Sequence, residues 1–193
     1  MAAKRQNSAA TPKPKETWTV VVVYEDTTTR ERAMAVCDQL VKRFWSKVEF
    51  EFSWWRQTYL ADSNIAKAAA WSAANADLIV FSTHSDSELS AGLKAWVETW
   101  LEKRREREGA LIGLIGTARD PKTDTASKHR YLRQIAERAR MDYLSTELSA
   151  APEAIADSIE SIHQRADQIT SVLDEILSHT PLHPSPPRRS TDG

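Results

Sequence analysis

Polar and charged side chains gather at two places where a run of apolar residues ends. After Tyr24 come two acids, three threonines and an arginine, in the order Glu25, Asp26, Thr27, Thr28, Thr29 and Arg30. After Phe81 come hydroxyl, imidazole and carboxyl groups, in the order Ser82, Thr83, His84, Ser85 and Asp86. Threonines and an arginine at the start of a helix can hold a phosphate. A histidine beside serines and an aspartate can donate a proton or contact a ligand, so His84 is the candidate catalytic residue.

Other kinds of site find little support in the composition. The chain has one cysteine, Cys37, which excludes an internal disulfide and any multi-cysteine zinc or iron-sulfur site. Its five glycines are too scattered for a Gly-x-Gly-x-x-Gly or Walker-type loop. No strained turn around a serine indicates a nucleophilic triad, and no spacing of His and acids indicates a metal site.

The apolar runs that end at Tyr24 and Phe81 must position these polar groups. Both runs belong to an alternation of expected strands and helices along the chain. Apolar strands are expected at 18–24, 48–52, 77–81, 109–116 and 141–145, and helices at 27–44, 61–75, 91–106, 127–140 and after Pro152. Such alternation predicts an α/β domain of three layers around a doubly wound, parallel, five-stranded sheet. The first, third and fourth strands are the most apolar, which favours strand order 2-1-3-4-5. Ligands would then bind between the loops 24–30, 82–90 and 116–123, the last of which contains Thr117.

Seven tryptophans stand out in a chain of this length. Trp54 and Trp55 are expected just after the second strand, where they would serve core or surface packing; the alternative is that one of them flanks the crevice and supplies an aromatic surface, or contacts a partner. Trp71 is expected to pack in the core, as is Cys37 on the apolar stripe of the first helix. The charge-balanced run 102–108 (EKRRERE) is expected to be the solvated end of a helix.

The charge distribution suggests where the folded part begins and ends. Residues 1–15 carry bases and no acid, and 180–193 are rich in proline, so both segments are expected to be disordered tails. Residues 16–179 would form a single domain in which acids outnumber bases, and this argues against nucleic acid as a partner. The sequence shows neither a membrane-spanning run nor a secretory signal, which favours a cytoplasmic protein.

Residues 76–101 (ADLIVFSTHSDSELSAGLKAWVETWL) resemble the flavodoxin-like NAD(P)H-dependent FMN reductases and quinone reductases. Leu93 and Lys94 match the end of the family's flavin-cradling loop without a gap, and Asp86 falls where the family has Asn. Thr83 and Ser85 replace the family's Pro and Tyr, which removes a flat face for the flavin ring. The resemblance covers residues 17–148 and implies FMN as cofactor, held by the loops at 27–30 and 82–86.

The chain also looks like a two-component receiver domain, which shares the same strand order. Glu25 and Asp26 match the receiver's acidic pair, and Thr117 with Ala118 matches its Thr-Ala step. Ser82 stands where the phosphoacceptor Asp is expected, and the Lys expected after the fifth strand is missing. This resemblance implies a pseudo-receiver without aspartyl-phosphate chemistry.

Three hypotheses follow. The favoured one is a flavodoxin-like domain that binds a small molecule or a protein and has lost most flavin-binding features, because Glu25 and Asp26 would repel a phosphate. The alternatives are an NAD(P)H-dependent FMN or quinone reductase and a degenerate receiver. Ile and Leu residues recur at heptad spacing between 155 and 176, which predicts a helix that packs on its own sheet or forms a homodimer.

Overall fold

The structure is a computed structural model of the chain, and it describes residues 15–86, 88–105, 107–116, 125–147, 155, 158–162 and 164. The chain divides into two units, residues 1–157 and 158–193. Of the second unit, the described residues 158–162 and 164 are helical, within the stretch expected to be a helix. The predicted tails, except for Lys15, and most of the heptad stretch lie outside the described residues.

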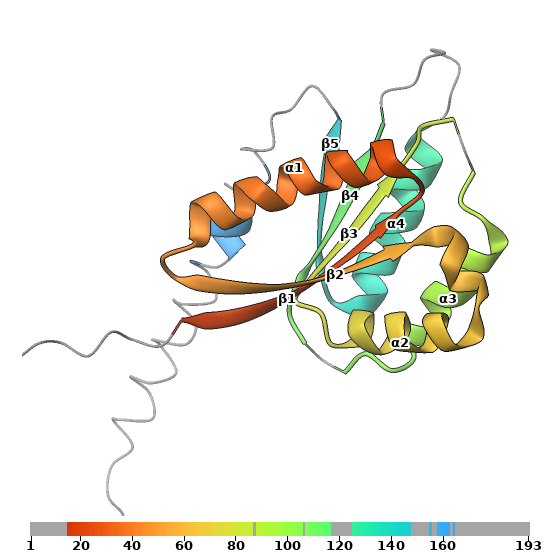
Figure 1. Cartoon of the computed structure of the whole chain (residues 1–193), viewed down its shortest axis with the longest axis horizontal. Helices are drawn as coiled ribbons and strands as arrows, with labels where there is room; N and C mark the ends of the chain where they lie inside the picture. The colour runs from red at the N-terminus through yellow and green to blue at the C-terminus, as the bar shows by residue number, and fades with distance from the viewer. Residues whose placement is uncertain are drawn as a thin grey trace, which may run out of the picture. The chain divides into compact units, whose positions relative to one another are not determined.

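The first unit is built on five parallel strands (Figure 1). They are β1 (Glu16–Tyr24), β2 (Val48–Arg56), β3 (Leu78–Thr83), β4 (Ala110–Ile115) and β5 (Asp142–Glu147). Their order in the sheet is β2-β1-β3-β4-β5, which confirms the predicted order. Every residue of β3 and β4 is buried, and all of them except Ser82 and Thr83 are apolar or glycine, as expected for central strands of a parallel sheet.

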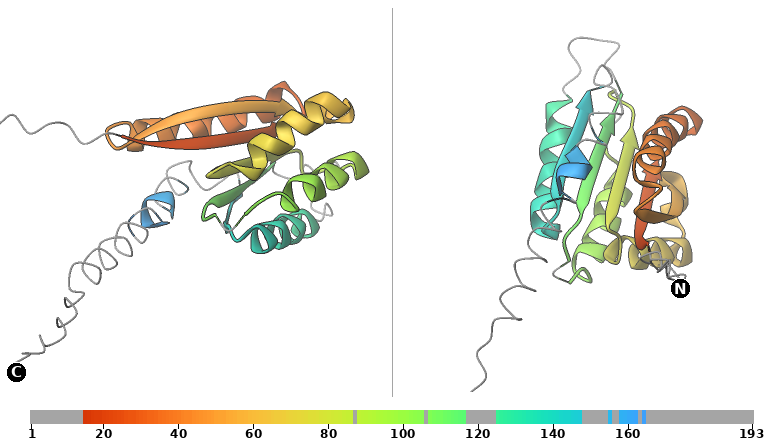
Figure 2. Two further views of the ribbon diagram at one scale, coloured as in Figure 1. Left: turned by 90° about the horizontal axis from the view of Figure 1, so that it is seen from below. Right: turned by 90° about the vertical axis from the view of Figure 1, so that its left-hand side faces the viewer.

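Helices cover both faces of this sheet (Figure 2), so the predicted three-layer α/β class is confirmed. The helices are α1 (Thr27–Phe44), α2 (Ser63–Ala74), α3 (Ala91–Leu101) and α4 (Ala126–Ala139), with a short 3-10 helix, η1 (Gln57–Ala61), after β2. Alternate residues of β1 and β3, such as Val21 and Phe81, join α2, α3 and α4 in one apolar core cluster. Helix α1 lies on the opposite face, where its buried stripe includes Cys37 as predicted.

The structure corrects the predictions for three aromatic residues. Strand β2 runs to Arg56, so Trp54 and Trp55 lie inside the strand and point to opposite faces of the sheet. Trp71 is not a core residue, because 69% of it is exposed on α2. The alanines around it supply the buried side of that helix instead.

The charged run after α3 also differs from the prediction. Helix α3 ends at Leu101, and Arg104 folds back beneath the sheet rather than extending a solvated helix. Its guanidinium donates hydrogen bonds to the carbonyl oxygens of Ala139 (3.1 Å), Ala76 (2.9 Å) and Ala73 (3.3 Å). Burial lowers the pKa of Arg104 from its usual value. One side chain therefore joins the end of α2, the end of α4 and the chain after α3 at the amino edge of the sheet.

Among the described helices, we find none with both the length and the apolar character needed to cross a membrane.

Candidate functional site

The turn between β1 and α1 is closed by its own side chains. Asp26 is the N-cap of α1, and its carboxylate accepts a hydrogen bond from the main-chain N–H of Thr29 at 2.9 Å. The Thr29 hydroxyl in turn accepts the N–H groups of Glu25 (3.0 Å) and Asp26 (2.9 Å). This reciprocal capping box satisfies donors that a helix N-terminus otherwise leaves without partners. Asp26 is therefore the N-cap of α1.

The loop after β3 is tied to this turn through His84. Its ring Nε2 lies 2.7 Å from the Asp26 carboxylate, and its main-chain N–H donates to the Glu25 carboxylate at 3.1 Å. These two contacts join the loop after β1 to the loop after β3. The two strands are neighbours in the sheet, and the chain adds β2 on one side of β1 but adds β3, β4 and β5 on the other. The switch point predicted from strand order is thus the place where His84 and the acidic pair meet.

Hydrogen bonds hold Asp26 in its ionised form. The N–H of Thr29 is the largest cause, followed by the His84 side chain, and together they lower the pKa of Asp26 from 3.8 to about 2. The carboxylate remains 43% exposed and the His84 side chain 34% exposed. Asp26 is therefore a charged group that faces solvent at the crevice across the whole neutral range.

Arg32 lies beneath the acidic turn, one helical turn after Thr29. Its guanidinium donates to the carbonyl oxygen of Thr83 at 2.9 Å and also reaches that of Leu114 at 3.5 Å. Burial lowers the pKa of Arg32, while Asp26 and Glu25 act in the opposite direction. A Cβ atom on Gly116 would come within 3.0 Å of this guanidinium, so the glycine leaves the room that Arg32 occupies.

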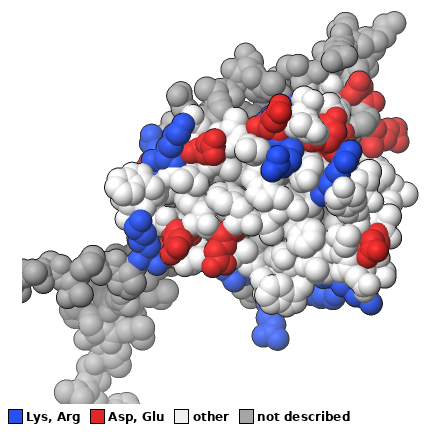
Figure 3. All heavy atoms as spheres, viewed as in Figure 1, with Lys and Arg blue, Asp and Glu red and all other residues white. Residues whose placement is uncertain are grey.

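Lys128 reaches the same place from the first turn of α4. Its ammonium group donates to the main-chain carbonyl of His84, and the residue is only 6% exposed. Burial lowers the pKa of Lys128, and the nearby carboxylates of Glu25, Asp86 and Glu88 oppose that shift. Figure 3 shows acidic and basic side chains intermingled over the end of the sheet where α1 begins. This edge of the sheet thus carries charges of both signs, and its two cations, the half-buried Arg32 and the buried Lys128, already bind main-chain carbonyls.

The turn is a poor seat for the phosphate of FMN, which the resemblance implied, because three of its main-chain N–H groups are already engaged and two carboxylates lie beside it. A phosphate at a helix N-terminus needs main-chain N–H groups as donors. At this turn the N–H groups of Glu25 and Asp26 bind the Thr29 hydroxyl, and that of Thr29 binds the Asp26 carboxylate. Two carboxylates at the same turn would also repel a phosphate dianion.

The remaining candidates on the β3 loop are largely enclosed. Ser82 is fully buried, and its hydroxyl donates to the main-chain carbonyl of Thr29 at 2.7 Å. Thr83 is fully buried too, and its hydroxyl has no hydrogen-bond partner among the described residues. Ser85 is 6% exposed, whereas Asp86 is exposed. Of the five candidates from Ser82 to Asp86, only His84 and Asp86 therefore present much side-chain surface to a ligand.

On the α1 loop, the candidates divide in the same way. Thr27 and Thr28 are exposed in the first turn of the helix, and Thr29 is buried as part of the cap. Arg30 extends away from the β3 loop, because its guanidinium lies over the Trp54 ring at 5.7 Å. The four residues thus do not converge on one point.

The two tryptophans of β2 lie on opposite faces. The ring of Trp54 packs against Tyr24 on the α1 side, with 6.4 Å between ring centres. Trp55 packs against the core cluster on the other side, and its indole N–H donates to the Ser53 hydroxyl at 3.2 Å. Trp54 therefore flanks the start of α1, while Trp55 belongs to the packing beneath α2.

Two residues of the crevice were missed in the sequence, and one predicted residue cannot be placed. Arg32 and Lys128 were not singled out, although Arg32 follows Thr29 by three residues and so shares its buried helix face. Lys128 carries no such signal, because its contact with His84 joins elements far apart in the chain. Thr117 and the loop 117–124 lie outside the described residues.

The described residues contain no group of three or more His, Cys, Asp or Glu that could hold a metal ion. The contact of His84 with Asp26 resembles the histidine–acid half of a catalytic triad. The nearby Ser82 hydroxyl is buried against Thr29, so it is not presented to a substrate as a nucleophile.

Comparisons with known proteins identify structures but no family. No family model and no curated protein matches the chain. Flavodoxin from Megasphaera elsdenii is similar at 13% identity and a TM-score of 0.44, over 70% of this chain and 89% of the flavodoxin. The flavoenzyme NAD(P)H:acceptor oxidoreductase FerB from Paracoccus denitrificans is similar at 12% identity and a TM-score of 0.39, over 70% of this chain and 78% of FerB. General stress protein 14 from Treponema denticola, solved with FMN, is similar at 17% identity and a TM-score of 0.41, over 84% and 99% of the two chains.

The assignment of this chain to the flavodoxin-like fold rests on its own strand order, β2-β1-β3-β4-β5.

Proposed function

We propose that this flavodoxin-like domain is a binding module whose crevice, at the carboxyl edge of β1 and β3, accepts a small molecule or a protein segment without holding FMN. The observation that supports this proposal is the closed α1 turn. Thr29 and Asp26 engage three of the main-chain N–H groups at this turn, and His84 holds both acids beside it.

The charge of the crevice favours a neutral or cationic ligand. A phosphate placed about 4 Å from one carboxylate would be repelled by roughly 4 kcal/mol per pair of unit charges at the dielectric typical of a protein surface. Arg32 and Lys128 offset this only in part, because both are engaged with main-chain carbonyls. An ammonium or guanidinium group would instead be attracted to Asp26, which is ionised and partly exposed.

The two alternatives make different demands on the same residues. A reductase of FMN or quinones needs the flavin that the turn disfavours. A receiver needs a phosphoacceptor carboxylate at the end of β3, where this chain has the buried Ser82. The reductase hypothesis therefore predicts flavin binding, and the receiver hypothesis predicts phosphorylation of a carboxylate. A binding module of the proposed kind would show neither.

Titration with FMN, followed by flavin fluorescence, tests the proposal. We expect the protein to purify colourless and to bind FMN with a Kd weaker than about 100 μM, a free energy near −5.5 kcal/mol. The double variant Glu25→Ser/Asp26→Gly should bind FMN more tightly, by about tenfold for 1.4 kcal/mol of relieved repulsion. The matched control Glu31→Gln/Asp38→Asn removes two exposed acids from α1, the helix that follows this turn, and should leave FMN binding unchanged.

A yellow preparation with stoichiometric FMN would contradict the proposal and favour the reductase. A positive test is a thermal-shift screen of small amines and guanidines. Ligands that raise the melting temperature should lose their effect in Glu25→Ser/Asp26→Gly, and a ligand effect that survives in this variant would place binding elsewhere.

A further inference from the structure

Strand β2 forms an open edge of the sheet. It is nine residues long and pairs with β1 along its whole length, from Val48 opposite Glu16 to Arg56 opposite Tyr24. On its other side, no strand of the described residues pairs with it. Main-chain N–H and C=O groups that point outward from such an edge are ready to pair with another strand.

One face of this edge strand carries a row of aromatic rings. Phe50 and Phe52 stack with 5.8 Å between ring centres, and Phe52 and Trp54 are 6.3 Å apart. All three side chains are only partly buried, although they lie on the face covered by α1. Figure 3 shows an uncharged surface across the middle of the face on which β2 lies in Figure 1, with the charged side chains toward its margins. The edge therefore combines open main-chain groups with apolar surface.

The opposite face of β2 carries Trp55, which packs against the core cluster, together with Ser53 and the only two acids of the strand. Glu49 and Glu51 alternate with the aromatic residues and are exposed. Any strand that pairs with β2 must avoid placing an acid opposite either glutamate, because like charges directly opposite destabilise a sheet. This requirement restricts the possible partner strand and its register.

We propose that a second copy of this chain adds its own β2 to the edge, antiparallel, about a two-fold axis that passes through Phe52. In this register Phe52 faces its own copy and Phe50 faces Trp54, so the three rings of each chain form cross-strand aromatic pairs. On the other face Glu51 lies opposite Ser53 and Glu49 opposite Trp55. All nine residues pair, and no two charges of the same sign are opposed.

Neighbouring symmetric registers are worse. An axis at Glu51 would place this residue directly opposite its own copy. An axis at Ser53 would place Phe50 opposite Arg56 and leave Val48 and Glu49 beyond the end of the partner's strand. The self-complementary interface that a two-fold dimer requires is thus best formed with the axis at Phe52. The two sheets would join into one of ten strands, two copies of the five shown.

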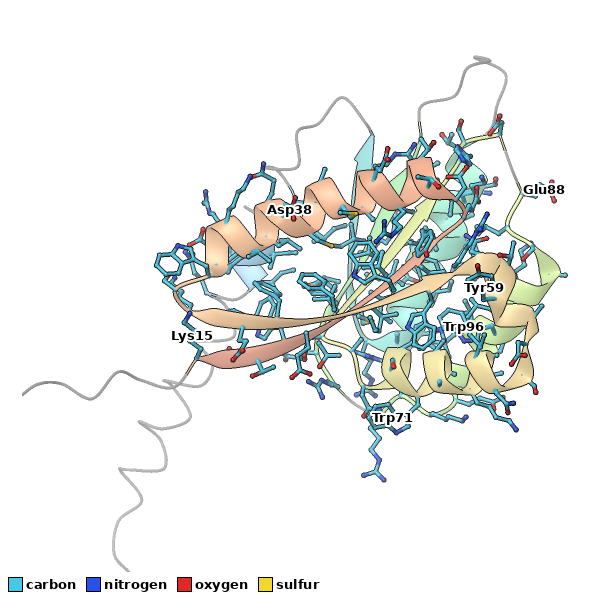
Figure 4. All side chains as sticks on the ribbon, in the orientation of Figure 1. Lys15, Asp38, Tyr59, Trp71, Glu88 and Trp96 are labelled. Atoms are coloured by element: carbon cyan, nitrogen blue, oxygen red, sulfur yellow. The ribbon has the colours of Figure 1, made fainter. Side chains whose placement is uncertain are left out.

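Light scattering on the purified chain tests the dimer, independently of any ligand at the crevice. We expect the mass of a dimer for the unaltered chain. Phe52→Lys and Phe52→Glu should each give monomers, because each brings like charges together at the axis. An equimolar mixture of the two variants should restore a dimer of one chain of each kind. The control Trp71→Lys changes an exposed tryptophan that points away from the molecule in Figure 4, and it should remain dimeric.

A second measurement tests the register with variants at exposed or partly exposed positions. In Glu51→Cys/Ser53→Cys the two new thiols of one copy face those of the other, at a spacing that suits a disulfide. We expect this double variant to form a covalent dimer under mild oxidation, and Glu51→Cys alone to form much less. Circular dichroism checks that each variant is folded.

Three results would overturn the proposal. The first is a monomeric unaltered chain at every concentration. The second is a folded Phe52→Lys variant that remains dimeric. The third is a dimer that Ile162→Glu dissociates while Phe52→Lys does not, because the interface would then be the heptad stretch 155–176.

Discussion

Removing the carboxylate of Asp26 should weaken the fold and loosen the crevice together. We expect Asp26→Ala to lower the free energy of unfolding at pH 7 by about 1.5–2 kcal/mol. About 1 kcal/mol comes from the lost cap on α1, where Asp26 accepts the N–H of Thr29 at 2.9 Å. A further contribution of about 0.5–1 kcal/mol comes from the contact with His84 at 2.7 Å, which is limited by solvent exposure.

Asp26→Asn separates these two contributions. The amide oxygen of asparagine is also a good N-cap, so it should still accept the N–H of Thr29. Only the charge is lost, and we expect a destabilisation of about 0.5–1 kcal/mol. The pair Asp26→Ala and Asp26→Asn therefore compares the cap with the charge at a single position.

The pKa of Asp26 adds a pH dependence with a definite sign. Because folding lowers this pKa from 3.8 to about 2, the folded state binds the proton less readily than the unfolded state. The stabilisation is complete above pH 3.8 and is lost as the pH falls from 3.8 through 2. Such a change in pKa corresponds to roughly 2.5 kcal/mol for a shielded group, and solvent screening at a carboxylate that is 43% exposed reduces it to about 1 kcal/mol.

Urea unfolding at pH 7 and at pH 2.5, followed by circular dichroism, measures both effects. The unaltered protein should lose roughly 0.7 kcal/mol more than Asp26→Asn when the pH is lowered between these values, because pH 2.5 still lies above the folded pKa of about 2. Equal losses in the two proteins would refute the role of the Asp26 charge. A loss below about 0.5 kcal/mol for Asp26→Ala at pH 7 would refute the role of the cap.

Two further predictions concern buried groups away from the crevice. Arg104→Leu should lower the free energy of unfolding by about 3–4 kcal/mol, because three main-chain carbonyls lose a charged donor. Urea unfolding measures this loss, and a loss below about 1 kcal/mol would show that water replaces the guanidinium. The Cys37 thiol should not react with an aromatic disulfide reagent at pH 8 until urea unfolds the protein, because burial raises its pKa to about 12. Rapid reaction in the native state would contradict this burial.

The order of the elements and their chemistry within each segment could be predicted from the sequence. A run of valines such as 20–23 is compatible with a central strand and with little else, because every residue must be apolar when both faces are covered. Asp26 was predictable as a cap since short polar side chains compete for the first N–H groups of a helix. The meeting of His84 with Asp26 followed from the strand order, because the carboxyl ends of neighbouring parallel strands share one edge.

Contacts that depend on exact directions in space were decided by the tertiary structure alone. Arg32 and Lys128 occupy the crevice because two helices aim them at carbonyls of β3 and its loop, and neither residue type marks such a position in a sequence. Arg104 looked like one base in a solvated charged run, but the chain turns after Leu101 and brings it to the ends of two other helices. Trp71 looked like a core residue by type, yet the alanines already fill that side of α2, so the indole faces water. Local pattern determines which face of an element is apolar, whereas the packing of distant elements determines which individual side chains are buried and what they bind.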